Sequence, residues 1–163
     1  MKTEVSLEIM KVELVVVGKT TQKWLKEGFE EYFGRLKHYL PCSVREIQPA
    51  GAVPKNVAIE KEGKLILDKV AAKDWVVLLD EHGKEFTSEQ LAELLNKRMS
   101  AGVTNMVLIS GGAFGVSESV KSRADLVLSA SRFTFTHQMI RLVMAEQLYR
   151  AMTILKNESY HHE

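Results

Sequence analysis

Hydrophobic and polar positions along the chain form two alternating kinds of segment. Short runs that are continuously apolar or strictly alternating are typical of β-strands buried on one or both faces. Between them, apolar residues recur every three or four positions, as on one face of a helix. The expected strands are residues 12–17, 43–48, 75–79, 105–110 and 125–129. The expected helices are residues 22–39, 56–72, 88–100, 117–122 and 138–153.

Boundary residues support this division. Pro41 stops the first helix, and Thr87 with Gln90 forms a capping box before the third. Residues 80–84 are expected to be a turn that ends the third strand. Because strands alternate with helices throughout, the pattern predicts one α/β domain, a mostly parallel sheet with helices on both faces.

Composition narrows the class. The chain has 163 residues, of which 45% are hydrophobic and 26% charged, as in an ordinary globular domain. No apolar run approaches the roughly 20 residues that span a bilayer, and no signal peptide is evident, so we expect a cytoplasmic protein without membrane contact. One cysteine and the adjacent pair His161 and His162 do not provide zinc-ligand spacing, so we expect no metal. With a net charge of +1, binding to nucleic acid would depend on local patches and shape.

Two loops follow expected strands in the last third of the chain. The first contains Gly111, Gly112 and Gly115, and the second runs from Ser129 to His137. Loops at the carboxyl ends of parallel strands are where open α/β sheets bind small molecules. There is no P-loop, and no dinucleotide-binding glycine motif follows the first strand. The loops therefore suit a ligand recognised by its hydrogen-bonding edge, although the glycines are equally compatible with a tight turn that binds nothing.

The second loop leads into the final helix. Thr136 is placed to cap that helix, and the helix dipole at His137 favours a neutral imidazole that accepts a proton. The alternative for His137 is packing at the helix end. Phe133 and Phe135, at strand spacing, are also compatible with a role as core anchors.

The final helix has a second unusual property. Its apolar residues extend well beyond one stripe, which predicts cover from a second subunit. Glu146 and Arg150 stand four residues apart in the order that favours an ion pair. The segment after the helix, with Tyr160 and His161, carries ionisable groups and is expected to be mobile until a substrate binds.

Taken together, these motifs resemble a known family. They include Val12 to Lys19, Leu79-Asp80 with Gly83-Lys84, Ile109 to Gly115, Leu128 to His137, Arg141, Ala145 to Ala151, and Tyr160-His161. In this order, from Met10 to Glu163, they are similar to the bacterial ribosomal RNA large-subunit methyltransferase H family, which are YbeA-like SPOUT enzymes.

The resemblance implies a SPOUT-like fold with a C-terminal trefoil knot, and a homodimer whose site is completed across the interface. It implies S-adenosylmethionine as the cofactor and N3-methylation of a pseudouridine in a single-stranded loop of 23S ribosomal RNA, on the assembled ribosome. Its usual cofactor positions fall on Leu79, Gly112 and the stretch Ser131, Arg132, Phe133, Thr134, Phe135 and Thr136, beside which the loop glycines Gly111 and Gly115 stand. The candidate catalytic residues are His137, Arg150, Tyr160 and His161.

Two departures from the family pattern are visible. His162 stands where the family usually has a basic residue, and residues 1–9 form an N-terminal extension outside the single domain of residues 10–163. One alternative function is a noncatalytic ribosome- or nucleotide-binding module of the same fold, which would bind the cofactor without methylating RNA. Another is an α/β enzyme that acts on a free small metabolite.

Overall fold

The computed structural model describes residues 9–162, so the expected N-terminal extension lies, apart from Ile9, outside the described residues. Strands and helices alternate from start to end, as predicted. The strands are β1 (Lys11–Val17), β2 (Cys42–Ile47), β3 (Trp75–Glu85), β4 (Asn105–Ser110) and β5 (Leu126–Ser129). The helices are α1 (Lys23–Leu36), α2 (Lys55–Leu67), α3 (Ser88–Ser100), α4 (Glu118–Arg123) and α5 (Met139–Leu155).

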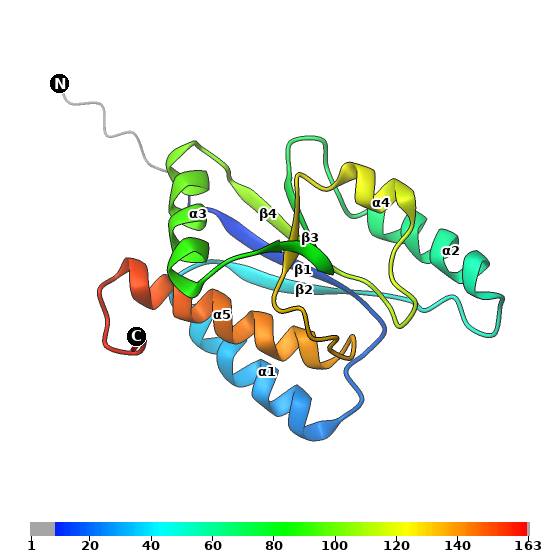
Figure 1. Ribbon diagram of the computed structural model, residues 1–163, viewed down its shortest axis with the longest axis horizontal. Coiled ribbons are helices and arrows are strands. Elements are labelled where there is room, and N and C mark those ends of the chain that lie inside the picture. Colours follow the sequence, from blue (N-terminus) through cyan, green and yellow to red (C-terminus); the bar gives the residue numbers. More distant parts are fainter. Residues whose placement is uncertain (1–8, 163) are drawn as a thin grey trace.

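The strands form one sheet in the order β2-β1-β4-β3-β5, and every neighbouring pair is parallel. Helices α1, α3 and α5 cover one face, and α2 with α4 covers the other (Figure 1). The predicted α/β class is therefore confirmed. The trefoil knot stays a prediction of the family resemblance.

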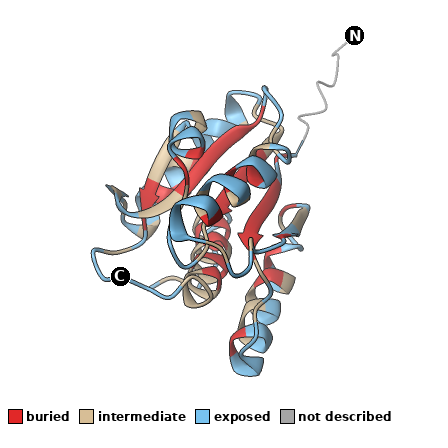
Figure 2. Cartoon of the chain, turned by 90° about the vertical axis from the view of Figure 1, so that its right-hand side faces the viewer, coloured by how far each residue is buried: buried red, intermediate tan, exposed pale blue. Residues whose placement is uncertain are grey.

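The continuous apolar runs of the strands follow from this double cover. Along β1, Val12, Leu14 and Val16 belong to the core beneath α1, α3 and α5, whereas Val15 and Val17 belong to the core beneath α2 and α4. Successive side chains of a strand point to opposite faces, so a strand buried on both sides needs apolar residues at every position. Figure 2 shows the buried residues concentrated in the strands, between helices whose outer faces are exposed.

The strand β3 is longer than predicted. Residues 80–84 were expected to be a turn, but the strand continues to Glu85 and pairs with β5 again at Lys84 and Glu85 after a shift in register. Leu79 and Lys84 both pair with Leu128, so residues 80–83 between them have no partner in β5 and form a bulge, at the place where their polar composition predicted a break in the strand. The bulge places Asp80, Glu81 and His82 at the carboxyl edge of the sheet.

Other boundaries differ from the prediction by a few residues, and the predicted capping box of α3 is present. Thr87 Oγ1 accepts a hydrogen bond from the Gln90 backbone, and the Gln90 side chain accepts one from the Thr87 backbone. Within residues 9–162, none of the helices has the length and apolar character needed to cross a bilayer. In the same range, no three His, Cys, Asp or Glu side chains gather closely enough to hold a metal ion.

Candidate active site

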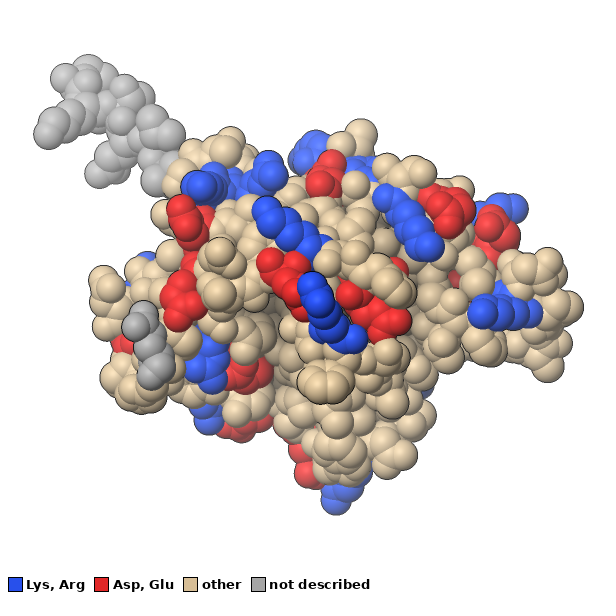
Figure 3. All heavy atoms as spheres, viewed as in Figure 1, with Lys and Arg blue, Asp and Glu red and all other residues tan. Residues whose placement is uncertain are grey.

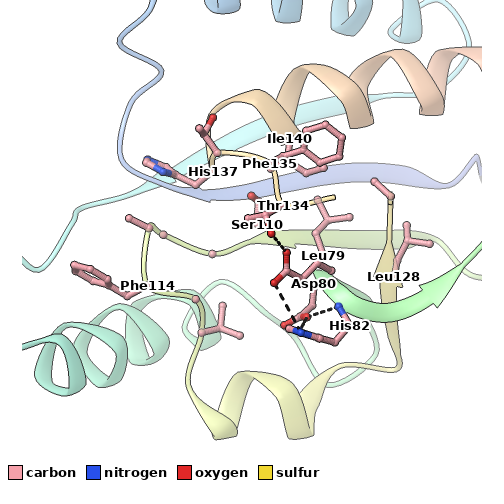
Figure 4. A pocket seen from close by; sticks show the side chains of 18 of the residues that line it. Leu79, Asp80, His82, Ser110, Phe114, Leu128, Thr134, Phe135, His137 and Ile140 are labelled. Carbon is pink, nitrogen blue, oxygen red and sulfur yellow. Dashed lines mark hydrogen bonds and ion pairs between the residues drawn. The ribbon is translucent and has the colours of Figure 1, made fainter. Parts of the chain in front are cut away.

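A cavity of about 640 Å³ lies at the carboxyl ends of β3, β4 and β5 (Figure 4). We call it the strand-end cavity. Its wall is formed by residues 79–82 of β3, by residue 110 at the end of β4 with residues 111–116 after it, and by residue 128 of β5 with residues 130, 131 and 133–137 after it. Lys121 of α4 and Ile140 of α5 complete the wall. Its volume lies within the range of about 300–1,000 Å³ that is typical of small-molecule sites.

The glycine loop after β4 is a tight turn that borders this cavity. The Gly115 backbone N–H donates to the Gly112 carbonyl at 3.1 Å, and Gly115 has a φ of 90°, which favours glycine. A Cβ atom on Gly112 would lie 3.1 Å from Glu62 Oε2 and 3.4 Å from Val17 Cγ1. A side chain at position 112 would therefore press on the flexible Glu62 carboxylate of α2 and contact Val17 of β1, and the loop presents mainly backbone groups to the cavity.

The loop after β5 is held by short-range hydrogen bonds. Ser129 Oγ donates to the Ser131 carbonyl at 2.8 Å, and the Phe133 N–H donates to Ser131 Oγ at 3.0 Å. The Thr134 hydroxyl donates to the Glu81 carboxylate, which ties this loop to the end of β3. Phe133 is 81% exposed and Phe135 is 36% exposed. The interpretation of these phenylalanines as core anchors is wrong. The segment leaves the sheet at Ser129, and outside a strand the spacing of every second residue no longer indicates which side chains are buried.

The start of α5 is anchored to the loop after β1. Arg141, which is buried, donates from Nη2 to the Val17 carbonyl at 2.7 Å and from Nη1 to Thr20 Oγ1 at 3.0 Å. Gln138 Oε1 accepts the Thr21 N–H at 2.8 Å. These bonds fix the position of His137 at the rim of the cavity, where it is labelled in Figure 4.

Thr136 and His137 differ in detail from their predicted roles. The helix begins at Met139, with Gln138 at the cap position, but Thr136 Oγ1 still accepts the Met139 N–H at 3.1 Å. Partial burial, and then the positive charge of Arg141, lower the pKa of His137, while Glu62 acts in the opposite direction. The expected direction is therefore found, but burial is its main cause.

The structure brings most of the predicted cofactor positions together. The strand-end cavity is lined by Leu79, Gly111, Gly112, Gly115, Ser131, Phe133, Thr134, Phe135 and Thr136. Arg132 is the exception in this set, because its exposed side chain points toward Glu85, with 3.5 Å between Nε and Oε2, beside a neighbouring hollow. Of the four candidate catalytic residues, His137 alone lines the cavity.

The other three candidates, Arg150, Tyr160 and His161, lie together elsewhere. The tail, residues 157–162, turns back along α5 because Asn157 has a φ of 55° and closes the helix. The Glu158 N–H donates to the Thr153 carbonyl at 2.9 Å and the Asn157 N–H to the Ile154 carbonyl at 3.1 Å, which is the Schellman pattern. The expectation of a mobile tail contrasts with the packed arrangement found here.

Glu146 is the centre of this second group, which we call the Glu146 cluster. Its carboxylate accepts hydrogen bonds from Arg150 Nη2 at 2.5 Å and from the Tyr160 hydroxyl at 2.9 Å. His161 lies between Arg150 and Glu89, with Nδ1 3.2 Å from Arg150 Nη1 and Nε2 2.6 Å from Glu89 Oε1. The predicted Glu146–Arg150 ion pair is thus present.

The surroundings of the Glu146 cluster raise the pKa of two of its hydrogen-bond donors, Arg150 and Tyr160, and so favour their protonated forms. The hydrogen bond to Glu146 raises the pKa of Arg150. Burial, followed by hydrogen bonds with Tyr32 and Glu146, raises the pKa of Tyr160. Tyr160 therefore remains a neutral phenol at physiological pH, and in this arrangement it is a poor base.

Several residues of the cavity were not predicted from the sequence. Asp80, Glu81 and His82 follow Leu79 directly, and Phe114 lies between two of the loop glycines. Their position after a buried strand is the signal that identifies the carboxyl edge of the sheet. It was not used for residues 80–82 because they were assigned to a simple turn.

Comparison with known proteins agrees with this architecture. Residues 10–161 match the family model described as "Predicted SPOUT methyltransferase". A protein of Parabacteroides distasonis is 48% identical over 158 residues, which cover 94% of this chain and all of the relative. A protein of Christiangramia forsetii is 46% identical over 156 residues, covering 94% and 99%, and one of Trichlorobacter lovleyi is 40% identical over 153 residues, covering 94% and 100%.

All three relatives carry the name "Ribosomal RNA large subunit methyltransferase H". The chain belongs to the SPOUT methyltransferase family, and the resemblance found in its sequence is confirmed.

Proposed function

We propose that the protein is an S-adenosylmethionine-dependent methyltransferase that modifies N3 of a pseudouridine in a single-stranded loop of 23S ribosomal RNA. It would act on assembled ribosomes in the cytoplasm. The observation that carries the proposal is the strand-end cavity, which lies at the ligand-binding edge of a sheet in a SPOUT methyltransferase chain. The names of the relatives support ribosomal RNA as the substrate.

The residues of the cavity fit this cofactor. S-adenosylmethionine has no phosphate, and the cavity is bordered by the backbone of two loops rather than by a ring of basic side chains. Leu79, Phe135 and Ile140 offer apolar contact for an adenine ring, and exposed backbone groups can recognise its polar edge. The carboxylates of Asp80 and Glu81 are suited to ribose hydroxyls. When bound, the cofactor supplies an electrophilic methyl group on sulfur.

The chemical work of the protein is then positioning and proton removal. N3 of pseudouridine carries a weakly acidic proton, which must leave as the methyl group arrives. His137 is at the rim of the cavity and its lowered pKa favours the neutral imidazole that can accept this proton. A guanidinium such as Arg150 can stabilise the deprotonated base or hold a phosphate.

Arg150, Tyr160 and His161 do not line the cavity of their own chain, so we propose that the Glu146 cluster of one copy completes the cavity of a second copy. Exposed apolar side chains support such a homodimer, among them Phe133 and the 57% exposed Trp24. Phe133 lies exposed in the loop after β5, and a second copy would bury it. Homodimer interfaces of this kind usually bury about 2,000 Å² or more.

Methyl transfer from labelled S-adenosylmethionine tests the proposal directly, with ribosomes, separate subunits and naked RNA as acceptors. We expect label in large-subunit RNA at N3 of a pseudouridine, with ribosomes as the best acceptor. Leu79→Trp, which enlarges a half-buried side chain inside the cavity, should abolish cofactor binding in calorimetry and methyl transfer together. Cofactor binding without transfer to any RNA would favour a noncatalytic module.

Sedimentation tests the dimer separately. At low micromolar concentration the protein should sediment at about twice its chain mass of 18.4 kDa. A monomer that still methylates ribosomes would contradict a site shared between two copies.

A further inference from the structure

Phe114 is an exposed aromatic residue that belongs to neither of the two hydrophobic cores. It lies near the tip of the tight turn closed by Gly112 and Gly115, and its side chain is 56% exposed. Figure 4 shows Phe114 on the turn after β4 and His137 on the loop before α5, with both rings directed away from Leu79 and Leu128. An exposed aromatic ring beside a site offers a flat face on which a nucleic-acid base can stack.

A lysine accompanies this ring. Lys55, the first residue of α2, places Nζ 5.8 Å from the centre of the Phe114 ring. Among residues 9–162, no carboxylate lies within ion-pair distance of Lys55 or of Lys19, which is exposed in the loop after β1. The Gly18 N–H donates to the Ile47 carbonyl at 2.8 Å, so the loops that follow β1 and β2 are adjacent. This rim therefore combines an accessible ring with the ammonium of Lys55, and the Glu62 carboxylate lies on the other side of the turn, against Gly112.

The charge of the rest of the surface helps to identify the kind of partner that this rim would bind. The net charge is only +1, and Figure 3 shows charges of both signs interspersed on the face that it displays. A partner bound by charge alone would need a broad basic area. An aromatic ring with one or two lysines instead matches single-stranded RNA, whose bases stack on aromatic side chains and whose phosphates pair with lysines.

We propose that Phe114 and Lys55 hold the nucleotide next to the methylated one, with the ring stacked on its base and the ammonium paired with its phosphate. The inference rests on the proposed RNA methyltransferase function and adds two residues that position the substrate. The contact would lie across the cavity mouth from His137, so that the target base is held between two fixed points while it enters the cavity.

The test compares Phe114→Ala, Phe114→Tyr and Lys55→Gln with wild type. Single-turnover methylation is measured against ribosome concentration, and S-adenosylmethionine affinity is measured by calorimetry. Lys73→Gln serves as the matched control, because it removes the same charge before β3, at the opposite edge of the sheet.

We expect Phe114→Ala to raise the half-saturating ribosome concentration about 10-fold, since a stacked base contributes roughly 1–3 kcal/mol. The limiting rate and the cofactor affinity of Phe114→Ala should change less than about 3-fold. Phe114→Tyr should keep the half-saturating ribosome concentration of the wild type, because it keeps the ring. Lys55→Gln should reduce the logarithmic slope of the salt dependence by about one. Lys73→Gln should behave as wild type.

Three outcomes would overturn the inference in distinguishable ways. Wild-type half-saturation for Phe114→Ala, in an enzyme that methylates ribosomes, would remove Phe114 from the RNA contact and leave the proposed function intact. A loss of cofactor affinity in Phe114→Ala would assign the ring to the cofactor. Absence of methyl transfer by the wild type to ribosomes, subunits and RNA would overturn the proposed function and this inference with it.

Discussion

The strand-end cavity and the Glu146 cluster both contain predicted catalytic residues, yet they differ in how many of their polar groups already have hydrogen-bond partners within the chain. At the cavity, backbone groups of two loops, the imidazole of His137 and the ring of Phe114 face open space. In the Glu146 cluster, Arg150, Tyr160 and His161 are all engaged with carboxylates. The first region is arranged to receive a ligand, whereas the second is held in place by its own hydrogen bonds and would act on the cavity of a second copy.

Loss of the Glu146 cluster should have the largest effect on activity. We expect Arg150→Ala, and a chain truncated after Glu158, to reduce single-turnover methylation about 100-fold, as removal of a charge-stabilising group typically does. Cofactor affinity should stay within about 2-fold, because these residues are absent from the cavity wall of their own chain and are proposed to act on the target base. Calorimetry and ribosome methylation at matched folded concentration measure the two quantities. Wild-type rates in both variants would make the cluster purely structural.

Of the two regions, the strand-end cavity should matter more for the free energy of unfolding, because the buried Arg141 anchors α5 beside it. Arg141→Met removes the hydrogen bonds to Val17 and Thr20, and we expect a loss of about 1.5–3 kcal/mol in the free energy of unfolding. Urea denaturation measures it. The same change at Arg35, whose ion pair with Glu31 is exposed, should cost at most about 1 kcal/mol. Equal losses at the two positions would mean that Arg141 does not anchor α5.

A titration can report whether the tail is docked in solution. The hydrogen bond to Glu158, 2.5 Å long, and then burial raise the pKa of Tyr39 to about 12. In Glu158→Gln the pKa should fall toward the ordinary value of about 10. Tyrosinate absorbance against pH, compared with Glu93→Gln on the exposed face of α3, measures this shift. If the two variants titrate alike, the tail does not rest on α1 and α5.

The smallest expected effect concerns His137. Its pKa is lowered by burial and Arg141, so the unfolded chain binds the proton more readily than the folded one. The stability that depends on neutral His137 is full above pH about 6.5 and declines as the pH falls through that value. His137→Gln should therefore flatten the decline, and histidine NMR should find the wild-type pKa below its ordinary value. A pKa at or above that value would contradict the assigned environment.

Much of the fold followed from simple periodicity, as the alternation of Val12, Leu14 and Val16 with Val15 and Val17 illustrates. The cavity loops were also placed correctly, because strand ends of a parallel sheet share one edge. Local pattern failed where tertiary contacts decide. The strand β3 resumes at Lys84 because β5 offers backbone partners there, whereas residues 80–83 form a bulge. The tail folded back because Asn157 closes α5, a signal that spacing of apolar residues does not contain.

The central claim is that the cavity of one copy works with the Glu146 cluster of the other, and mixing two inactive variants tests it most directly. Leu79→Trp disables the cavity and Arg150→Ala disables the cluster. After subunit exchange, a mixed dimer has one site with both parts intact if the parts come from different copies. We then expect about a quarter of wild-type methylation from a statistical mixture. No recovery, with mixed dimers demonstrated by mass spectrometry, would contradict the account.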